Sequence, residues 1–513
     1  MITYAILVLG DQLSTRCGAF ADIDPCDAVV CMSERLSEAS RPISHKARVA
    51  YFIACMRRFA SKMAGSGWTV SYRKLADKGE PELWRDLARL ASESGATVAR
   101  CAWPGEHAMV ARIEGACAEF GLRMEWVEDG KFIYSRKAFM EWSAGRKSML
   151  QEAFYRHARA KTGILMSLDG SPAGGQWNFD AANRGGYPKG GPGLVPPRPL
   201  FEHEQGDLDV LSEVEALCPS HPGSLRHFNW PLDEEQAREA ATAFLDDKLA
   251  GFGKTQDAMW DGEPFGHHAL LSAPLNVGLL DPLWLCSQAE ARYKAGLCPI
   301  ESAEGFIRQV LGWREYIRGM YWLRMPGLKS KNEMGATLDL PAWFWDPSKT
   351  RMSCMKAAIG QTMEHGHAHH IQRLMVIGNF CLAAGVDPQQ VADWFGGIYV
   401  DAVEWVHLPN VMGMALHADG GDLATKPYLA GGAYIAKQSN YCKSCPYDPK
   451  SKSGPTACPL SVMYWGAVDR HQERLAGNPR TSMPAAQWRK MEPAAQNALR
   501  AVDKSMRDDL DAL

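Results

Sequence analysis

The chain has 513 residues, too many for one hydrophobic core, so two or three domains are expected. Its net charge of −3 excludes a protein that binds nucleic acid through its overall charge, so any DNA contact needs a local basic surface. No run of 18 apolar residues occurs and no basic signal segment precedes the first apolar run, so we expect a cytoplasmic protein without a membrane span, whose 14 cysteines are thiols or metal ligands.

Strand and helix patterns alternate over the first 130 residues. Short apolar runs rich in β-branched residues predict buried strands, and residues 46–63 repeat apolar side chains at helical spacing. The predicted strands are 3–9, 28–32, 68–73, 97–102 and 124–127. This alternation predicts an α/β domain with a parallel sheet over residues 1–130.

Polar side chains follow two of these strands. Ligands of a parallel sheet bind beyond the carboxyl ends of its strands. Asp11, Gln12, Glu34 and Glu38 occupy that position, and they could equally cap their own loops. No GxGxxG motif occurs, so a dinucleotide fingerprint is absent.

The middle of the chain begins with a basic segment. Residues 136–161 carry seven Lys or Arg against two Glu, a net charge of +5. A solvated helix face is the usual meaning of such a segment, and contact with DNA phosphates is the alternative, through Arg146, Lys147, Arg156 and Arg159. A Gly/Pro-rich stretch at 168–200 predicts a long connection inside an interdomain region over 131–230. Helical spacing dominates 231–513 and predicts an all-α domain, with helices near 234–250, 285–295, 302–323, 355–384 and 388–405.

Three cysteines of this domain lie in a polar loop. Cys442 and Cys445 are followed by Cys458, in a segment too polar to bury three thiols singly. We therefore infer a zinc site or an iron–sulphur cluster, and the proline after Cys458 favours the cluster. A fourth ligand must come from elsewhere; the candidates are Cys354 and Cys381, with His471 as a further candidate for zinc.

A histidine-rich stretch over 365–380 is predicted to be helical. On a helix, His370 shares a face with Leu374 and Ile377, and Arg373 lies beside it. A histidine near a buried arginine suits proton transfer, whereas a polar interfacial helix is the alternative. Asp401 could pair with Arg373. Aromatic residues at 343–345, 394, 395, 399 and 405 suit either a core or electron hopping.

Several of these stretches resemble the photolyase/cryptochrome superfamily, and within it the iron–sulphur bacterial branch of (6-4) photolyases and cryptochromes. The resemblance covers essentially the whole chain. The stretches that carry it are 7–13, 145–147, 154–156, 268–280, 309–316, 369–375, 408–414, 425–428 and the three-cysteine loop.

The resemblance implies three bound groups. The helical domain is expected to hold FAD, and the α/β domain is expected to hold a 6,7-dimethyl-8-ribityllumazine antenna near Asp11, Gln12, Glu34 and Glu38. A [4Fe–4S] cluster is expected, with Cys354 implied as the fourth ligand beside Cys442, Cys445 and Cys458.

The resemblance also implies roles for single residues. His370 is implied as the proton donor to the lesion, with His369 and Tyr428 nearby. Trp394 and Trp345 are implied as the electron-transfer chain. The implied flavin contacts are Leu271, Ser272, Asn276, Arg373, Asn379, Asp401 and His407. Two positions depart from the branch: Phe395 replaces a tyrosine beside Trp394, and His407 replaces a glutamate that faces flavin N5.

The expected activity is light-driven repair of (6-4) photoproducts by a monomer that binds UV-damaged DNA. Two alternatives remain: a blue-light cryptochrome without repair activity, and a light-independent iron–sulphur protein that binds nucleic acid.

Overall fold

The computed structural model describes residues 2–35, 40, 42–75, 77 and 82–513. Over these residues five strands form one parallel sheet, in the spatial order β3-β2-β1-β4-β5. Their bounds are β1 Tyr4–Leu7, β2 Ala28–Ser33, β3 Thr69–Arg73, β4 Val98–Ala102 and β5 Arg123–Val127. All five predicted strands are confirmed.

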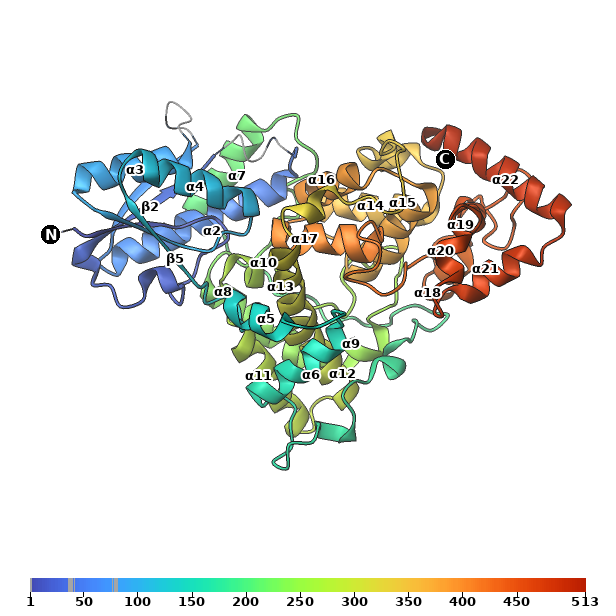
Figure 1. The fold of residues 1–513 in the computed structure, drawn as a ribbon, viewed down its shortest axis with the longest axis horizontal. Coiled ribbons are helices and arrows are strands. Elements are labelled where there is room, and N and C mark those ends of the chain that lie inside the picture. The colour runs from blue at the N-terminus through green and yellow to red at the C-terminus, as the bar shows by residue number, and fades with distance from the viewer. Residues whose placement is uncertain (1, 36–39, 41, 76, 78–81) are drawn as a thin grey trace.

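Side chains alternate along these strands and build a core on each face of the sheet. Ile6 and Val30 pack on the face with α2 (Lys46–Gly65), and Leu7 and Val29 pack on the face with α3 (Leu83–Ser94) and α4 (His107–Glu119). A parallel sheet buried on both faces explains why its strands are continuous apolar runs. The core on the α2 face continues into the helical remainder of the chain, which extends away from the sheet in Figure 1.

The region predicted as interdomain contains three α-helices among its described residues: α5 Arg136–Ser143, α6 Gln151–Thr162 and α7 Gln205–Leu217. Helix α7 packs on α2. Two arginines of α2 fix this contact: Arg57 pairs with Glu213 at 2.5 Å, and Arg58 pairs with Asp207 at 2.6 Å. A long stretch without α-helix separates α6 from α7, as the Gly/Pro-rich sequence predicts.

The rest of the chain is helical (Figure 1). Its α-helices are α8 Glu234–Ala243, α9 Leu249–Thr255, α10 Ser272–Val277, α11 Pro282–Lys294, α12 Ile300–Ile307, α13 Glu315–Arg324, α14 Ser353–His365, α15 Asn379–Ala384, α16 Pro388–Ile398, α17 Glu404–Pro409, α18 Gly432–Gln438, α19 Pro459–Arg470, α20 Gln472–Ala476, α21 Ser482–Arg489 and α22 Pro493–Asp508. Wider π-helical turns join some of them, including η10 Gln372–Gly378 and η11 Asn410–Ala415. Such turns often mark functional sites, and η10 and η11 pack against each other.

The prediction of one continuous helix over 355–384 is wrong. Helix α14 ends at His365, and residues 366–369 are not helical before the chain turns into η10. Gly366 causes the break, because it adopts a φ of +62° and its N–H closes the last turn on the Thr362 carbonyl. The histidine-rich stretch is therefore a loop followed by a helix.

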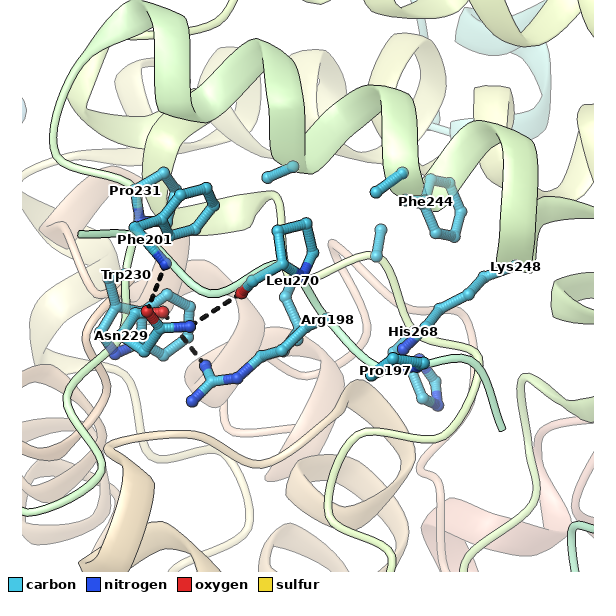
Figure 2. A pocket seen from close by; sticks show the side chains of 14 residues that line it. Pro197, Arg198, Phe201, Asn229, Trp230, Pro231, Phe244, Lys248, His268 and Leu270 are labelled. Carbon is cyan, nitrogen blue, oxygen red and sulfur yellow. Dashed lines mark hydrogen bonds between the residues drawn. The ribbon is translucent and has the colours of Figure 1, made fainter. Parts of the chain in front are cut away.

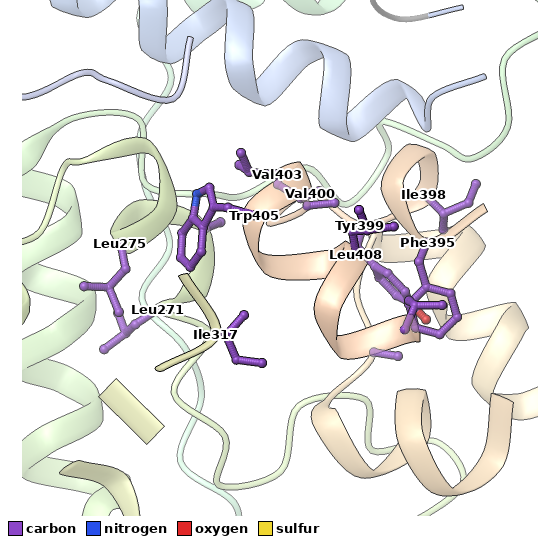
Figure 3. Packing of buried hydrophobic residues seen from close by; sticks show 14 of the residues in the cluster. Leu271, Leu275, Ile317, Phe395, Ile398, Tyr399, Val400, Val403, Trp405 and Leu408 are labelled. Atoms are coloured by element: carbon purple, nitrogen blue, oxygen red, sulfur yellow. The ribbon is translucent and has the colours of Figure 1, made fainter. Parts of the chain in front are cut away.

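Buried ion pairs link the loops that follow β1 and β5. Lys131 is almost fully buried, and its ammonium lies 2.9 Å from Asp11 and 3.2 Å from Asp129. The backbone N–H of Trp405, in α17, donates to the Gly105 carbonyl at 3.1 Å and so joins the helical part to the loop that follows β4. Figure 3 shows Trp405 among side chains from α10, α13 and α16, below α2.

No helix among the described residues is long and apolar enough to cross a membrane.

Candidate active site

An ion pair forms the centre of the candidate site. Arg373 lies on η10 and Asp401 on the loop between α16 and α17, and Arg373 Nη1 is 2.9 Å from Asp401 Oδ1. Ser272 Oγ donates to Asp401 Oδ2 at 2.6 Å, and Asn276 Nδ2 donates to the Asp401 carbonyl at 2.8 Å. Burial raises the pKa of Asp401, but the Arg373 charge and the hydrogen bonds from Arg373 and Ser272 outweigh it and lower the pKa. The predicted pairing of Arg373 with Asp401 is confirmed.

Buried ring nitrogens without a partner lie around this pair. His268 Nε2, His367 Nε2 and His369 Nδ1 have no hydrogen-bond partner among the described residues. The rings of His268 and His369 stack with centroids 4.2 Å apart. Burial lowers the pKa of all three, and the Arg373 charge lowers those of His367 and His369 further. Because buried polar groups are almost always hydrogen-bonded in native proteins, these nitrogens are free to bond to water or to a polar ligand.

A partly open pocket is lined in part by His268 (Figure 2). Arg198, Lys248 and His268 bring nitrogen groups to it, and Trp230 adds an aromatic face. The Trp230 ring lies 6.0 Å from the His367 ring, which connects the cavity to the ion pair. Neither Arg198 nor Lys248 pairs with a described carboxylate, and burial lowers the pKa of both. Together these residues suit an anionic group, such as a phosphate, attached to an aromatic one.

Sequence reasoning missed the lining of this cavity. The four side chains come from separate segments, and none of those segments carries a motif for anion binding. The only available signal was the sequence neighbourhood of His268, which precedes Leu271 and Ser272 by a few residues.

The other predicted flavin contacts lie outside the ion-pair network. Leu271 is buried at the start of α10. The Asn379 amide exchanges two hydrogen bonds, of 2.8 and 2.9 Å, with the backbone of Ala430. His407 is deeply enclosed, its Nδ1 has no described partner, and burial lowers its pKa to about 4. Its ring fills the space beside Gly396, where an added Cβ would lie 2.8 Å from His407 Nε2.

His370 begins the helical segment that follows the break. It is solvent-accessible although protein surrounds it on most sides, which places it in a recess. This enclosure, and then the Arg373 charge, lower its pKa to about 4. His370 is therefore neutral near pH 7 in the protein alone.

The two tryptophans predicted to transfer electrons differ in exposure. Trp394 is buried on α16, whereas Trp345 is 42% exposed. The rings nearest Trp394 are Phe344, Phe395 and Tyr399, with centroids 5.1, 5.5 and 5.8 Å away. Among the described residues no ring contact joins Trp394 to Trp345 directly. Phe344 connects them, because its carbonyl accepts from Trp394 Nε1 at 3.3 Å and is covalently bonded to Trp345.

Four thiols line one small cavity. Cys354, at the start of α14, faces it together with Cys442, Cys445 and Cys458. Cys381 and His471, the other candidates for a fourth ligand, do not line it. Within the described ranges no three His, Cys, Asp or Glu side chains are placed to hold a single metal ion. Gly432 is needed beside this cavity, because an added Cβ would lie 2.8 Å from Cys458 Sγ.

The predicted antenna contacts are bonded within the protein. Asp11 pairs with a buried lysine, and Gln12 Nε2 donates to the Ala102 carbonyl at the end of β4 at 3.0 Å. Glu34 accepts two hydrogen bonds from Arg57, at 2.6 and 2.9 Å. Glu38 lies outside the described residues.

The predicted DNA contacts of the basic segment differ in exposure and pairing. Arg146 and Lys147 are exposed, and Arg156 is exposed but pairs with Glu152 at 2.9 Å. The prediction for Arg159 is wrong. Arg159 is fully buried, and its guanidinium donates to two backbone carbonyls, those of Trp177 and Leu165.

Sequence reasoning also missed a group of cations around Tyr428. Arg184, Lys426 and Arg480 come from distant segments, yet the charges of Arg184 and Arg480 act on both Lys426 and Tyr428. Lys426 lies 5.5 Å from the centre of the Tyr428 ring, and Arg480 donates to Thr425 Oγ1 at 2.7 Å. Lys426 and Arg480 form no ion pair with a described carboxylate. In the described structure no hydrogen bond or ring contact joins Tyr428 to His370.

Comparison with known proteins identifies the family of this chain. The family model for deoxyribodipyrimidine photo-lyase-related proteins matches residues 6–230. The (6-4) photolyase of Agrobacterium fabrum is 41% identical over 497 residues, which is 97% of this chain and 97% of that protein.

Solved structures of low identity share the fold. The crystal structure of a bacterial class III photolyase from Agrobacterium tumefaciens superposes with a TM-score of 0.58 at 16% identity, covering 96% of this chain and 98% of the other. A cryptochrome of Synechocystis superposes with a TM-score of 0.56 at 13% identity, covering 96% and 99%. Identity along almost the whole length of a named enzyme is the stronger finding, and on that ground the chain belongs to the deoxyribodipyrimidine photolyase-related family.

Proposed function

We propose that this protein is a DNA photolyase that uses blue light to repair (6-4) photoproducts. The observation that carries the proposal is the Arg373–Asp401 pair, surrounded by buried histidines with unpartnered nitrogens, in a chain 41% identical to a (6-4) photolyase. Both the catalysed reaction and the bound groups below are parts of this proposal.

The residues around the pair fit FAD. Ser272, Arg373 and Asp401 offer a hydrogen-bonding edge to a flavin ring, and Lys248 and Arg198 offer positive charge to its phosphates. Leu271, Asn276, Asn379 and His407 complete the proposed contacts. A reduced flavin excited by blue light supplies the electron that splits the lesion, and the protein supplies orientation and excludes water.

We assign proton donation to His370. At a pKa of about 4 the imidazole is neutral near pH 7 and cannot act as an acid. Phosphates of bound DNA favour the cation, because negative charge nearby raises the pKa of a histidine. His370 then gives its proton to the hydroxyl group that returns to the neighbouring base. His369, stacked on His268, and Tyr428 are proposed to hold the lesion beside it.

Electrons for the flavin are proposed to arrive through Trp345 and Trp394. The exposed Trp345 can meet an external reductant, and the Phe344 peptide bridges it to the buried Trp394. Phe395, which packs on Trp394, has no proton to release and is not a station on this path.

The four thiols are proposed to hold a [4Fe–4S] cluster. A zinc ion needs thiolates that converge to about 2.3 Å from one point. Cys354, Cys442, Cys445 and Cys458 instead face one cavity with no three of them placed for one ion in the part of the chain that is described. This spacing favours a cluster of several iron atoms.

The antenna and the DNA surface complete the proposal. A lumazine is proposed at the carboxyl edge of the sheet, beside Asp11, Gln12, Glu34 and Glu38. UV-damaged DNA is proposed to lie over Tyr428, with Lys426 and Arg480 on its phosphates. Arg146, Lys147 and Arg156 remain candidate contacts at the edge of that surface.

Repair of a defined oligonucleotide tests the function. Purified protein is illuminated with an oligonucleotide that carries one (6-4) photoproduct, and separately with one that carries a cyclobutane dimer. Repair of the first alone is expected. His370→Ala should abolish it with unchanged flavin content, so wild-type yield from this variant would refute the role of His370. A flavin-loaded wild type that repairs neither lesion would instead indicate a photoreceptor.

A further inference from the structure

We propose that Gln372 is a positioning residue that couples the four-thiol cavity to the histidine loop, so that the group bound by the thiols sets the geometry of His369 and His370. This inference rests on the proposed function for the identity of that group. It adds a specific connection, through one buried amide, between two sites that lie on separate segments.

The Gln372 amide is buried, and both its oxygen and its nitrogen are hydrogen-bonded. The side chain is 1% exposed. Its Oε1 accepts from the backbone N–H of His369 and from Gln361 Nε2, both at 3.1 Å. Its Nε2 donates to Gln361 Oε1 at 2.9 Å and to the Tyr441 hydroxyl at 3.1 Å. Gln361 and Gln372 thus form a reciprocal pair, with one bond left for the loop and one for Tyr441.

Both partners of Gln372 belong to segments that carry thiols of the cavity. Tyr441 directly precedes Cys442, and its ring lines the cavity. Gln361 lies on α14, which has Cys354 in its first turn. A group bound by these thiols would fix the two segments relative to each other. A shift of one segment against the other would change the hydrogen bonds that Gln372 makes to Gln361 and Tyr441.

The histidine loop depends on this support. Residues 366–369 are not helical, and the ring nitrogens His367 Nε2 and His369 Nδ1 have no described partner. The loop is held instead through its backbone. Gln372 accepts from the His369 N–H, Gln361 Nε2 donates to the His367 carbonyl at 3.2 Å, and Arg373 Nε donates to the Ala368 carbonyl at 2.6 Å. Two of these three side-chain bonds come from the glutamine pair; a backbone bond from the Val400 N–H to the Gly366 carbonyl, at 3.0 Å, also holds the loop.

Hydrogen–deuterium exchange of the intact, loaded protein tests the coupling. Tyr441→Phe removes one hydroxyl and leaves the ring in the cavity. We expect exchange in peptides covering 366–372 to become at least about tenfold faster, with iron and flavin content unchanged. Tyr447→Phe is the matched control, because Tyr447 lines the same cavity but its hydroxyl has no hydrogen bond to a described residue. Equal exchange in Tyr441→Phe and the wild type would overturn the proposal.

A second arm asks whether the bound group acts through the same bond. Stripping iron from the wild type should accelerate exchange in 366–372 and leave peptides of the β-sheet unchanged. In Tyr441→Phe the same treatment should add little, because the connection is already broken. Additive effects would contradict coupling through Gln372. If Tyr441→Phe does not fold, Gln372→Met removes the bonds to Tyr441 and to the backbone N–H of His369, and stripping iron from this variant should add little to its exchange in 366–372. A protein that binds no iron would refute the cluster, whereas the comparison of Tyr441→Phe with Tyr447→Phe would still decide the role of Gln372.

Discussion

Asp401 carries the negative charge that makes the centre of the site. It is largely buried against Arg373, and Ser272 bonds to its second oxygen. We predict that Asp401→Asn lowers the free energy of unfolding by about 3 kcal/mol, because it leaves the guanidinium enclosed without its anion. The variant should also lose bound flavin. Denaturant unfolding and the flavin-to-protein ratio measure the two effects.

An exposed pair gives the matched control for that change. Glu152 and Arg156 pair at 2.9 Å on the surface of α6. Glu152→Gln should change the unfolding free energy by no more than about 1 kcal/mol, because surface ion pairs contribute little. Similar losses from Asp401→Asn and Glu152→Gln would show that enclosure of the Arg373 pair has no energetic consequence.

His45 makes stability depend on pH. Its Nδ1 accepts from the Ala47 N–H at the start of α2, and its Nε2 donates to the Met363 carbonyl at 2.9 Å, so the folded protein needs the neutral ring. Burial lowers its pKa from 6.5 to about 4. As pH falls below 6.5 the unfolded chain gains a proton that the folded chain excludes, so stability falls. We predict a loss of roughly 2 kcal/mol between about pH 7 and pH 5 from this residue.

The variant His45→Asn isolates that contribution. Asparagine can also accept from the Ala47 N–H but does not titrate. Its unfolding free energy, measured in urea across the same pH range, should fall less steeply than that of the wild type. Parallel curves for the two proteins would assign the pH dependence to other groups.

Helices and strands were predicted most accurately from the sequence where the local pattern of apolar residues matches the burial of the element. All five strands were predictable because a parallel sheet covered on both faces needs continuous apolar runs, such as 28–32. The helix break at 366–369 was not, because histidines are compatible with a helix as well as with a loop, and a single glycine such as Gly366 does not by itself end a helix. Only the positive φ of Gly366, which depends on tertiary packing, ends α14 there.

Parts of the site show the same limit. The Arg373–Asp401 pair could be proposed from residue type and spacing, and the structure confirms it. Arg159 could not be told from its basic neighbours, because its burial depends on two carbonyls outside the helix. The cavity cations Arg198 and Lys248 meet only when separate segments fold together.

The cysteine loop gives a prediction for a whole element. Cys354 faces the cavity with the three loop cysteines, whereas Cys381, on α15, does not. Cys354→Ala should therefore lose most iron and acid-labile sulphide per chain, and Cys381→Ala should retain both. Because cluster binding and folding are coupled, Cys354→Ala should also be recovered in lower yield. Loss of iron from Cys381→Ala but not from Cys354→Ala would show that Cys381, and not Cys354, is the fourth ligand.

For the whole molecule, charge must be concentrated locally if the protein is to hold DNA. The chain has a net charge of −3, so distant association is not favoured by its overall field. Part of the exposed basic charge is neutralised by ion pairs, as the charge of Arg156 is by Glu152. Lys426 and Arg480 have no such partner among the described residues, so their charge is available to phosphates.

This difference predicts which surface controls the salt dependence of DNA binding. The double variant Lys426→Gln/Arg480→Gln should weaken binding and reduce the slope of log affinity against log salt concentration by about 1.8, because each lost phosphate contact removes about 0.9. Arg156→Gln should change the slope by less, since Glu152 already neutralises that charge. Fluorescence anisotropy with undamaged and (6-4)-containing duplexes, at several salt concentrations, gives both slopes. A larger change of slope from Arg156→Gln than from the double variant would show that DNA binds at the basic face of α6 and not over Tyr428. Binding to either duplex should weaken by a similar factor in the double variant, because phosphates are common to both.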